Sequence, residues 1–514
     1  MISPLQQHPN RLRLRHLLSI GSGLLLCALF TACTPGPKYH APAPPPLAAN
    51  SYKESTVNFQ DADGWKVASP QDGMLRGKWW EIFHDAELNG YEDQLEINNQ
   101  NIKQYFENLM AARAMIREAR AQYWPTVTTG PSWNRTKTSG NLGHSSTANA
   151  GSTASTWSFP LDVSWTPDFF GKIRNEVREA EFAAQVSAAD LENERLVEQA
   201  TLAETYFQLR GQDALEKVLQ DTVESDKKAL DLNKSLYETG INDYSSVAGA
   251  ESTLRSAESA ALNVGVLRAQ YEHAIATLLG KPASDFAISV KPLLIVPPPI
   301  PTGIPSQLLE RRPDVAAAER TVAEANATIG IGYGAFFPSV TLSASGAFEA
   351  STFTHWFDWP SRFWSIGPTT SQLLFDGGLY RAELHQYEAT YNADVAIYRQ
   401  TALAAFQQVE DYLSATRILS LQVIKQREAV EAAKTTLDLE ISRFETGIDP
   451  YIDVTTAQVT LLSDQQSLVT LQIQESVASI ELIQALGGGW DLTQLPTPAQ
   501  LSAKPGKTDY VIQR

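Results

Sequence analysis

Very few residues of this 514-residue chain have the types and spacing that catalysis requires. The eight histidines are scattered, and no HExxH, Walker, GxSxG or CxxC pattern occurs, so no group of residues is placed to hold zinc, cradle a phosphate or activate a nucleophile. The segment RRPDV, Arg311–Val315, has a proline and an aspartate at a helix start, which capping and the helix dipole explain. The sequence therefore predicts no enzyme, no cofactor and no metal site.

One covalent modification is predicted, at a cysteine near the N-terminus. A basic start with three arginines precedes a short apolar run, residues 17–30, and small residues then lead to Cys33, which is the layout of a secretory signal. The segment FTAC resembles a bacterial lipobox, although Phe30 stands where leucine is usual. We predict a signal peptide over 1–32 and a lipid anchor, palmitate included, at Cys33, and Thr34 after it points to the outer membrane. An ordinary signal with an incidental cysteine is the alternative.

The overall charge limits which kinds of macromolecule the chain can bind. The formal net charge is −17 and is spread over the chain, whereas nucleic-acid binding needs basic patches, so a nucleic-acid partner is excluded. The proline-rich segment His40–Asn50 is typical of an extended spacer between an anchor and a folded body.

An internal repeat determines how the chain is organised. The segment YETGINDYSSVAGAE, Tyr237–Glu251, returns as FETGIDPYIDVTTAQ, Phe444–Gln458, at an offset of 207 residues. The pair Gly171 and Gly378 has the same offset, so a whole structural unit is duplicated. Each copy has a long stretch without proline, and residues 171–238 and 378–445 each predict one helix of roughly 100 Å. These helices carry too many charges for lipid and must project into water.

Helix 451–486 carries two apolar stripes, which predicts a neighbour on each side, as in the wall of a tube. A helix in a multilayered bundle is the alternative. The first stripe comprises Ile452, Val459, Leu462, Val469, Ile473, Ile480 and Ile483, and the second comprises Val454, Leu461, Leu468 and Leu482. The first copy of the repeat matches the second stripe with Val247, Leu254, Ala261 and Ile275.

The segments rich in turn residues predict strands. Apolar and polar residues alternate over Trp157–Trp165 and again over Val340–Phe348, with aromatic residues at the ends, which is typical of membrane-spanning barrel strands. A sandwich strand with one wet face has the same pattern. Each repeat offers two strands, although Arg362–Phe375 alternates less cleanly. Because a bacterial barrel needs about eight strands and lipid forbids open edges, four strands predict an oligomer.

Several segments in a fixed order carry a family resemblance. They are TPGPKY after the lipobox, KWWEIFHDAELN at Lys78–Asn89, ARAQYWPTV, DFFGKIR at Asp168–Arg174, LYETGIND, LLERRPDVAAAER at Leu308–Arg320, ANATIGIGYGAFFPSV, LFDGGLYR and the second FETGID. With them the chain resembles the outer membrane factors, the TolC-like exit ducts, in their NodT-type or OprM-like lipoprotein branch. The resemblance implies an α+β membrane protein, a homotrimer with a 12-stranded β-barrel, four strands per chain, continuous with a long periplasmic α-helical barrel.

The resemblance also implies a function. The chain would be the outer-membrane exit duct of a tripartite efflux system, lipid-anchored and extending into the periplasm, with a periplasmic adaptor and an inner-membrane transporter as partners. An exit duct for protein secretion and a non-conducting structural lipoprotein are the alternatives. The predicted domains are 1–32 signal peptide, 33–80 lipid-anchored extension, 81–290 first repeat, 291–488 second repeat and 489–514 tail.

The two corners are the candidate functional site. The resemblance implies that they form the periplasmic tip and dock the adaptor, with these residues: Gly240, Asn242, Asp243, Gly447, Asp449 and Pro450. Loops that only reverse the direction of long helices are the alternative. In relatives an aspartate ring and an apolar ring constrict the tip, and these positions fall on Thr456 and Ile452. Ile452 fits the apolar ring, whereas Thr456 departs from aspartate. Asp453 is the candidate for a displaced acidic ring, and a solvated helix face is its alternative.

Overall fold

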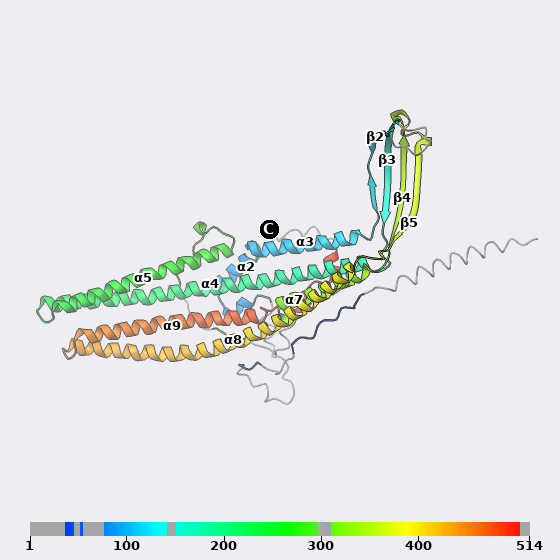
Figure 1. Cartoon of the computed structure of the whole chain (residues 1–514). Helices are drawn as coiled ribbons and strands as arrows, with labels where there is room; N and C mark the ends of the chain where they lie inside the picture. Colours follow the sequence, from blue (N-terminus) through cyan, green and yellow to red (C-terminus); the bar gives the residue numbers. More distant parts are fainter. Residues whose placement is uncertain are drawn as a thin grey trace, which may run out of the picture. The chain divides into compact units, whose positions relative to one another are not determined.

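The computed structural model describes residues 36–45, 52–54, 77–140, 151–292, 297–298, 300 and 310–503 (Figure 1). The predicted signal peptide and Cys33 lie outside the described residues. The chain divides into two compact units. The sheet unit comprises the described residues of Met1–Pro42, Ala111–Ala184 and Arg320–Ala396. The helical unit comprises the described residues of Ala43–Met110, Gln185–Glu319 and Ile397–Arg514.

Two long helices run through most of each repeat. Helix α4 spans Lys172–Glu238 and α8 spans Leu379–Glu445, each with 67 residues, so the predicted boundaries are confirmed to within one residue. Each begins after a glycine with positive φ, Gly171 or Gly378. Asp168 accepts hydrogen bonds from the first N–H groups of α4, and Asp376 does the same for α8, as helix starts require.

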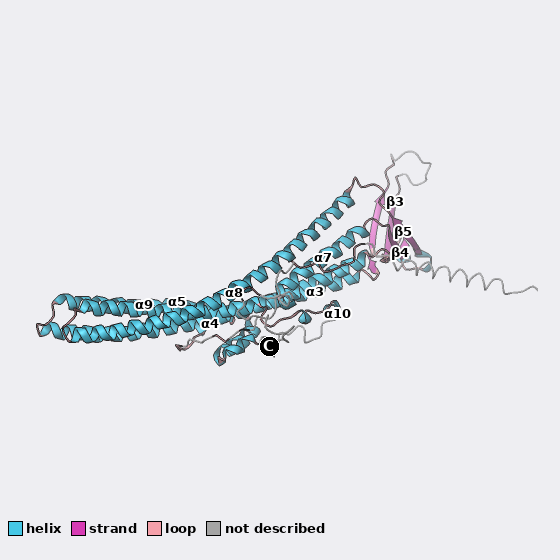
Figure 2. Ribbon diagram, turned by 90° about the horizontal axis from the view of Figure 1, so that it is seen from below, coloured by secondary structure: helices cyan, strands magenta, loops and turns pink. Residues whose placement is uncertain are grey.

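A shorter helix returns alongside each long one (Figures 1 and 2). Helix α5 spans Tyr244–Leu278 and α9 spans Tyr451–Ala485, with 35 residues each. The two hairpins share an apolar core, formed by Leu230, Val247, Ala250, Leu254, Tyr451 and Val454. The second apolar stripe of α9 is therefore buried within the chain at Val454 and Leu482.

The first stripe of α9 is buried only in part. Val469, Ile480 and Ile483 are buried, whereas Ile452 is 63% exposed and Val459 is 56% exposed in the single chain. Within one chain nothing described covers the first two turns of this stripe, so the second neighbour of α9 stays a prediction there. The same helix is covered along its second half because an additional layer packs there.

That additional layer comes from the N-terminal part of the helical unit. It consists of the 3-10 helix η3, Trp79–Phe83, and helix α2, Ala86–Asn98. The fully buried Trp79 and Leu88 pack in one cluster with Tyr206 of α4 and Ile480 of α9. Tyr206 Oη donates to Asp85 Oδ2 at 2.8 Å, so the layer is fixed by a buried hydrogen bond as well as by apolar contact.

Shorter elements connect these parts. Helix α3 spans Gln100–Ala121, and α7 spans Pro313–Gly334, where Pro313 is the first helical residue and Asp314 lies in the first turn, as RRPDV predicts. The remaining helical turns are η4 Ala283–Asp285, η5 Phe353–His355, η6 Trp359–Ser361, η7 Leu492–Gln494 and α10 Pro498–Ser502. No helix in the described ranges is both long and apolar enough to span a membrane.

The strands form one antiparallel sheet in the order β1-β3-β4-β5, with β2 also paired to β3 (Figure 1). Their bounds are β1 Thr126–Thr129, β2 Ser132–Lys137, β3 Thr153–Trp165, β4 Ser339–Ala350 and β5 Arg362–Ser371. Thr129 pairs with Leu161 and Ser132 pairs with Ser158, so β1 and β2 follow one another along β3. The four predicted strand positions are confirmed, with the first one split.

The split falls at Gly130-Pro131, because proline has no N–H to donate to the ladder. Strand β3 of the first repeat pairs with β4 of the second, Trp165 opposite Leu342. The sandwich interpretation is wrong for the part of the chain that the structure describes, because its strands belong to a single sheet. Apolar side chains stand exposed on that sheet, with Leu161 at 50% and Ile366 at 73%.

Candidate functional site

The two corners between long and short helices have the same backbone geometry. Gly240 and Gly447 have φ of 76° and 73°, the left-handed conformation that glycine adopts without strain. The next residue donates its N–H to the carbonyl five residues back, from Ile241 to Leu236 at 2.9 Å and from Ile448 to Arg443 at 2.9 Å. This is the hydrogen bond of a Schellman C-cap, so the predicted glycine C-cap is confirmed at both corners.

The start of the next helix differs between the corners. Asp243 is the N-cap of α5 and accepts from Ser246 N, and hydrogen bonds from Ser245 and Ser246 lower the pKa of the Asp243 carboxyl. At the second corner Pro450 takes the N-cap position and provides no side-chain hydrogen bond. The second corner is fixed instead by Tyr451, which is buried and packs its ring 5.3 Å from that of Phe444.

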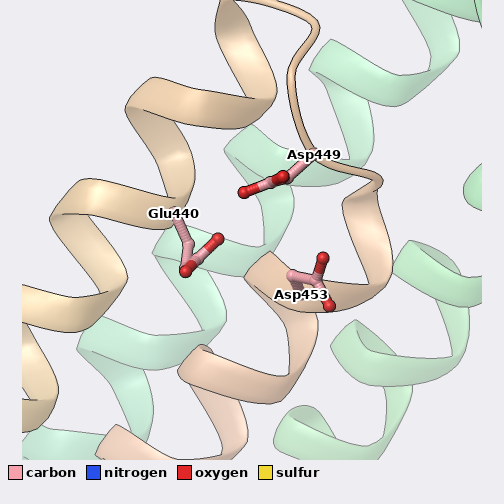
Figure 3. A group of neighbouring side chains, drawn as sticks. All are labelled: Glu440, Asp449 and Asp453. Carbon is pink, nitrogen blue, oxygen red and sulfur yellow. The ribbon is translucent and has the colours of Figure 1, made fainter.

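The second corner gathers three carboxylates, from Glu440, Asp449 and Asp453 (Figure 3). One oxygen of each lies within 4.8 Å of the others, and this is the one such acidic group that the described residues contain. Arg443 pairs with Asp449, Nη2 to Oδ1 at 3.1 Å, and this hydrogen bond holds the pKa of Asp449 below its usual range. Three oxygen ligands suit a hard cation, while the arginine already neutralises one of them.

The first copy of the repeat has amides at two of the positions that form this acidic group. At the same offset of 207 residues the first copy has Asn233 in place of Glu440 and Asn242 in place of Asp449. Asn242 Nδ2 donates to Asn233 Oδ1 at 3.3 Å, so two amides meet where the second copy places two carboxylates. Sequence reasoning identified Asp449 and missed Glu440 as its neighbour, because the alignment of the two copies pairs Glu440 with Asn233 without showing which residues either one contacts.

The three predicted gate residues lie on the first turns of α9. Ile452 is exposed, and Thr456, also exposed, donates its hydroxyl to the Ile452 carbonyl at 2.8 Å. Asp453 is exposed and lies with Glu440 and Asp449, across the corner. The structure therefore brings Asp453 into an acidic group within one chain, and it leaves Ile452 as an unpartnered apolar side chain.

The sequence of this chain is similar to a known protein family and to several of its members. A family model described as outer membrane efflux protein matches residues 92–281 and 304–488. The antibiotic efflux pump outer membrane protein ArpC of Pseudomonas putida is 30% identical over 464 residues, which cover 89% of this chain and 93% of that protein. Outer membrane protein OprJ of Pseudomonas aeruginosa is 29% identical over 487 residues, covering 91% and 96%.

Solved structures share the fold. The outer-membrane channel OprN is similar with a TM-score of 0.79 and 26% identity, over 89% of this chain and all of that one. The outer membrane protein VceC of Vibrio cholerae is similar with a TM-score of 0.74 and 26% identity, over 83% of this chain and all of that one. These proteins share the mostly helical fold with a small set of strands, and the chain belongs to the outer membrane efflux protein family.

Proposed function

We propose that this chain forms the outer-membrane exit duct of a tripartite efflux pump and passively conducts substrates delivered by an inner-membrane transporter through a periplasmic adaptor. The names of its relatives, which are outer-membrane components of efflux pumps, support this function. The structural observation that carries it is a single antiparallel sheet with unpaired edges, in a chain whose helices are 67 residues long.

The sheet supports a trimeric barrel. Its edge strands are β1 with β2 on one side and β5 on the other, and lipid offers no hydrogen bonds to an open edge. The segment after β5 also exposes large apolar side chains, with Leu374 at 93% and Phe375 at 87%. Three sheets joined edge to edge provide twelve strand positions, which is within the range of bacterial barrels, and cover these side chains.

The helices support a water-filled tube. At about 1.5 Å per residue, α4 and α8 are each roughly 100 Å long, about three times the thickness of a bilayer core. The exposed turns of α9 with Ile452 and Val459 provide an apolar seam for a second copy. A lipid anchor at Cys33 would hold the assembly in the outer membrane while the tube extends into the periplasm.

The corners then form the periplasmic mouth. Gly240 and Gly447 create two sharp, rigid turns in each chain, so a trimer presents six turns to an adaptor. Ile452 is placed to form an apolar ring at the mouth, and the acidic group with Asp449 and Asp453 ties the second hairpin together. Opening requires the second hairpin to move, because all three gate candidates, Ile452, Asp453 and Thr456, belong to it.

Single-channel conductance in planar bilayers tests this function. We compare the purified wild type with Ile452→Gly, and use Ile418→Gly as a control because Ile418 is an exposed apolar residue in the middle of α8. Both changes place a glycine in a helix, at a similar cost of about 1 kcal/mol. We expect small, infrequent openings in wild type and in the control, and openings severalfold more frequent in Ile452→Gly.

Two outcomes would contradict the proposal. A folded trimer that never conducts, with or without the substitution, leaves a structural lipoprotein without a pore as the function. Equal conductance of the two glycine variants places the constriction elsewhere than Ile452. The anchor is tested separately, because Cys33→Ser should abolish incorporation of labelled palmitate while a Cys27→Ser change should leave it intact.

A further inference from the structure

A groove of about 450 Å³ lies between α4, α8 and α9 in the helical unit. Its lining combines apolar side chains with carboxylates, and the residues that matter here are Asp411, Tyr412, Leu419, Ile473, Val477 and Glu481. The helices α4 and α9 approach closely at one end, because a Cβ on Gly211 would lie 2.1 Å from Ile473 Cδ1. Glycine at position 211 thus lets Ile473 lie against the α4 backbone.

A third carboxylate, that of Glu204 on α4, lies outside the lining of the groove and near enough to Glu481 and Tyr412 to interact with them electrostatically. Glu204 and Asp411 are 207 residues apart and occupy equivalent places in α4 and α8, so the repeat puts both at one level. Burial, and next the Glu481 carboxylate, raise the pKa of Glu204, and burial and both carboxylates raise the pKa of the Tyr412 hydroxyl. In a trimer, this level carries nine carboxylates, three from each chain.

These carboxylates have no cation of their own. Within the described ranges, no lysine or arginine forms an ion pair with Glu204, Asp411 or Glu481; Asp411 accepts only from the Gln407 amide, at 3.3 Å. The nearest cation that acts on Tyr412 is Arg312, and its guanidinium is already paired with Asp314 at 2.6 Å. Negative charge beside apolar surface is therefore left without compensation in this groove.

On α4 the groove lies on a different face from the additional layer. The layer covers Tyr206, whereas the groove is lined by Gln208, and side chains two residues apart on a helix point to nearly opposite sides. In the proposed tube the layer belongs outside, because three copies of it would block the lumen. The groove then faces the lumen, where transported molecules pass.

We propose that this groove binds lipophilic organic cations on the inner wall of the duct. Ile473, Val477 and Leu419 contact the apolar body, the carboxylates of Asp411 and Glu481 attract the charge, and Tyr412 provides an aromatic ring for cation–π contact. This inference rests on the proposed duct function and adds a substrate class to it. A weak site of this kind holds cations near the wall and lets them leave again.

Equilibrium dialysis with tetraphenylphosphonium tests the groove. The full-length protein is placed in lipid nanodiscs, and empty nanodiscs measure the partition of the probe into lipid. We expect saturable binding to wild type, and at least about tenfold weaker binding to the double variant Asp411→Asn, Glu481→Gln, since that change removes two of the charges that attract the probe. Glu475→Gln is the matched control on α9, because Glu475 does not line the groove and should leave binding unchanged.

Two further arms separate charge from apolar partition and from misfolding. Tetraphenylborate has the same organic body with the opposite charge and should show no saturable binding. The double variant Asp411→Glu, Glu481→Asp keeps both charges and should bind within about threefold of wild type, while all variants remain trimers. Conductance of the same preparations tests the duct itself.

The outcomes are distinct. A wild-type protein that conducts but binds no more tetraphenylphosphonium than empty nanodiscs overturns the groove and leaves the duct standing. Equal binding of tetraphenylborate, or unchanged binding in the variant lacking both charges, also overturns it. A protein that never conducts removes the duct function, and the inference falls with it.

Discussion

Arg443, in the last turn of α8, binds Asp449, which lies two residues before the start of α9. Because this hydrogen bond lowers the pKa of Asp449, it stabilises the corner above the carboxyl's usual pKa, and the contribution is lost as pH falls through the lowered value. We therefore predict that, in planar bilayers, openings of the wild-type channel become severalfold more frequent only as pH falls below about 4, the usual pKa of an aspartate.

The same ion pair predicts the behaviour of a variant at neutral pH. Arg443→Gln leaves Glu440, Asp449 and Asp453 to repel one another, so openings should be severalfold more frequent at pH 7 and more strongly reduced by added salt. Arg255→Gln is the control, because Arg255 forms ion pairs only with Glu251 and Glu258 of its own helix, α5. Identical records from the two variants would mean that the Arg443 pair has no part in closing the mouth.

The carboxyl of Glu204 predicts a pH dependence of stability in the opposite direction. Burial, and next the carboxylate of Glu481, raise the pKa of Glu204 to about 7. Its unfolded-state pKa is about 4.3, so its contribution to stability is present below that value and is lost as pH rises to 7. Glu204→Gln should raise Tm at pH 7.5 by a few degrees and have little effect at pH 4.5.

Thermal unfolding in detergent measures this difference. Asp231→Asn provides the comparison on the same helix, since Asp231 is exposed, and it should change Tm little at either pH. A Glu204→Gln protein with the wild-type pH profile would show that the carboxyl of Glu204 titrates normally.

A buried ion pair in the helical unit predicts a large effect on stability. Arg210 and Asp213 are both fully buried, with Nη1 and Oδ2 2.9 Å apart, and Asp213 also accepts from Arg268. Arg210→Met leaves part of that buried charge uncompensated and should cost about 3–5 kcal/mol in the free energy of unfolding. Lys217→Met removes an exposed pair seven residues along α4 and should cost less than about 1 kcal/mol. Denaturant unfolding of both variants measures the contrast, and equal losses would contradict it.

The corner glycines predict a sign difference between two chemically identical changes. Gly447 has φ of 73°, so Gly447→Ala strains the backbone and should destabilise the protein by about 1 kcal/mol. Gly249 lies within α5 with no atom near its missing Cβ, so Gly249→Ala should stabilise by about 1 kcal/mol. The Tm values of the two variants should therefore move in opposite directions, and a shared direction would refute the assigned conformations.

Local signals predicted the long elements well. Helices α4, α8 and α9 follow the glycines and prolines that end them, and β3 follows its alternating residues, because these patterns act over neighbouring residues. The break at Gly130-Pro131 was missed, because a two-residue interruption in a strand hardly changes the alternation. The layer around Trp79 was missed for another reason, since its partners on α4 and α9 lie more than a hundred residues away.

The sequence predicted the backbone turns of the candidate site but not the side chains that come together there. The repeat located Gly240 and Gly447 as corners, whereas the neighbour of Asp449 lies on the preceding helix, at Glu440. The carboxylates near Tyr412 come from three helices, and the pKa of two of them, Glu204 and Glu481, is raised by burial that no single segment reveals. Contacts between distant segments are what the sequence pattern leaves undetermined.

The duplicated corners share one backbone geometry but differ in their side chains. Amides meet at the first, Asn233 with Asn242, and acids meet at the second, Glu440 with Asp449. Asp243 places one carboxylate at the first corner, so around a mouth built from three chains, turns with one carboxylate would alternate with turns that carry the acidic group of three. Such a mouth is nearly sixfold in shape and only threefold in charge. If a partner binds all six turns through their shared shape, acid and salt would change its contacts mainly at every second turn, the one with the acidic group. Its binding would weaken at those three turns first.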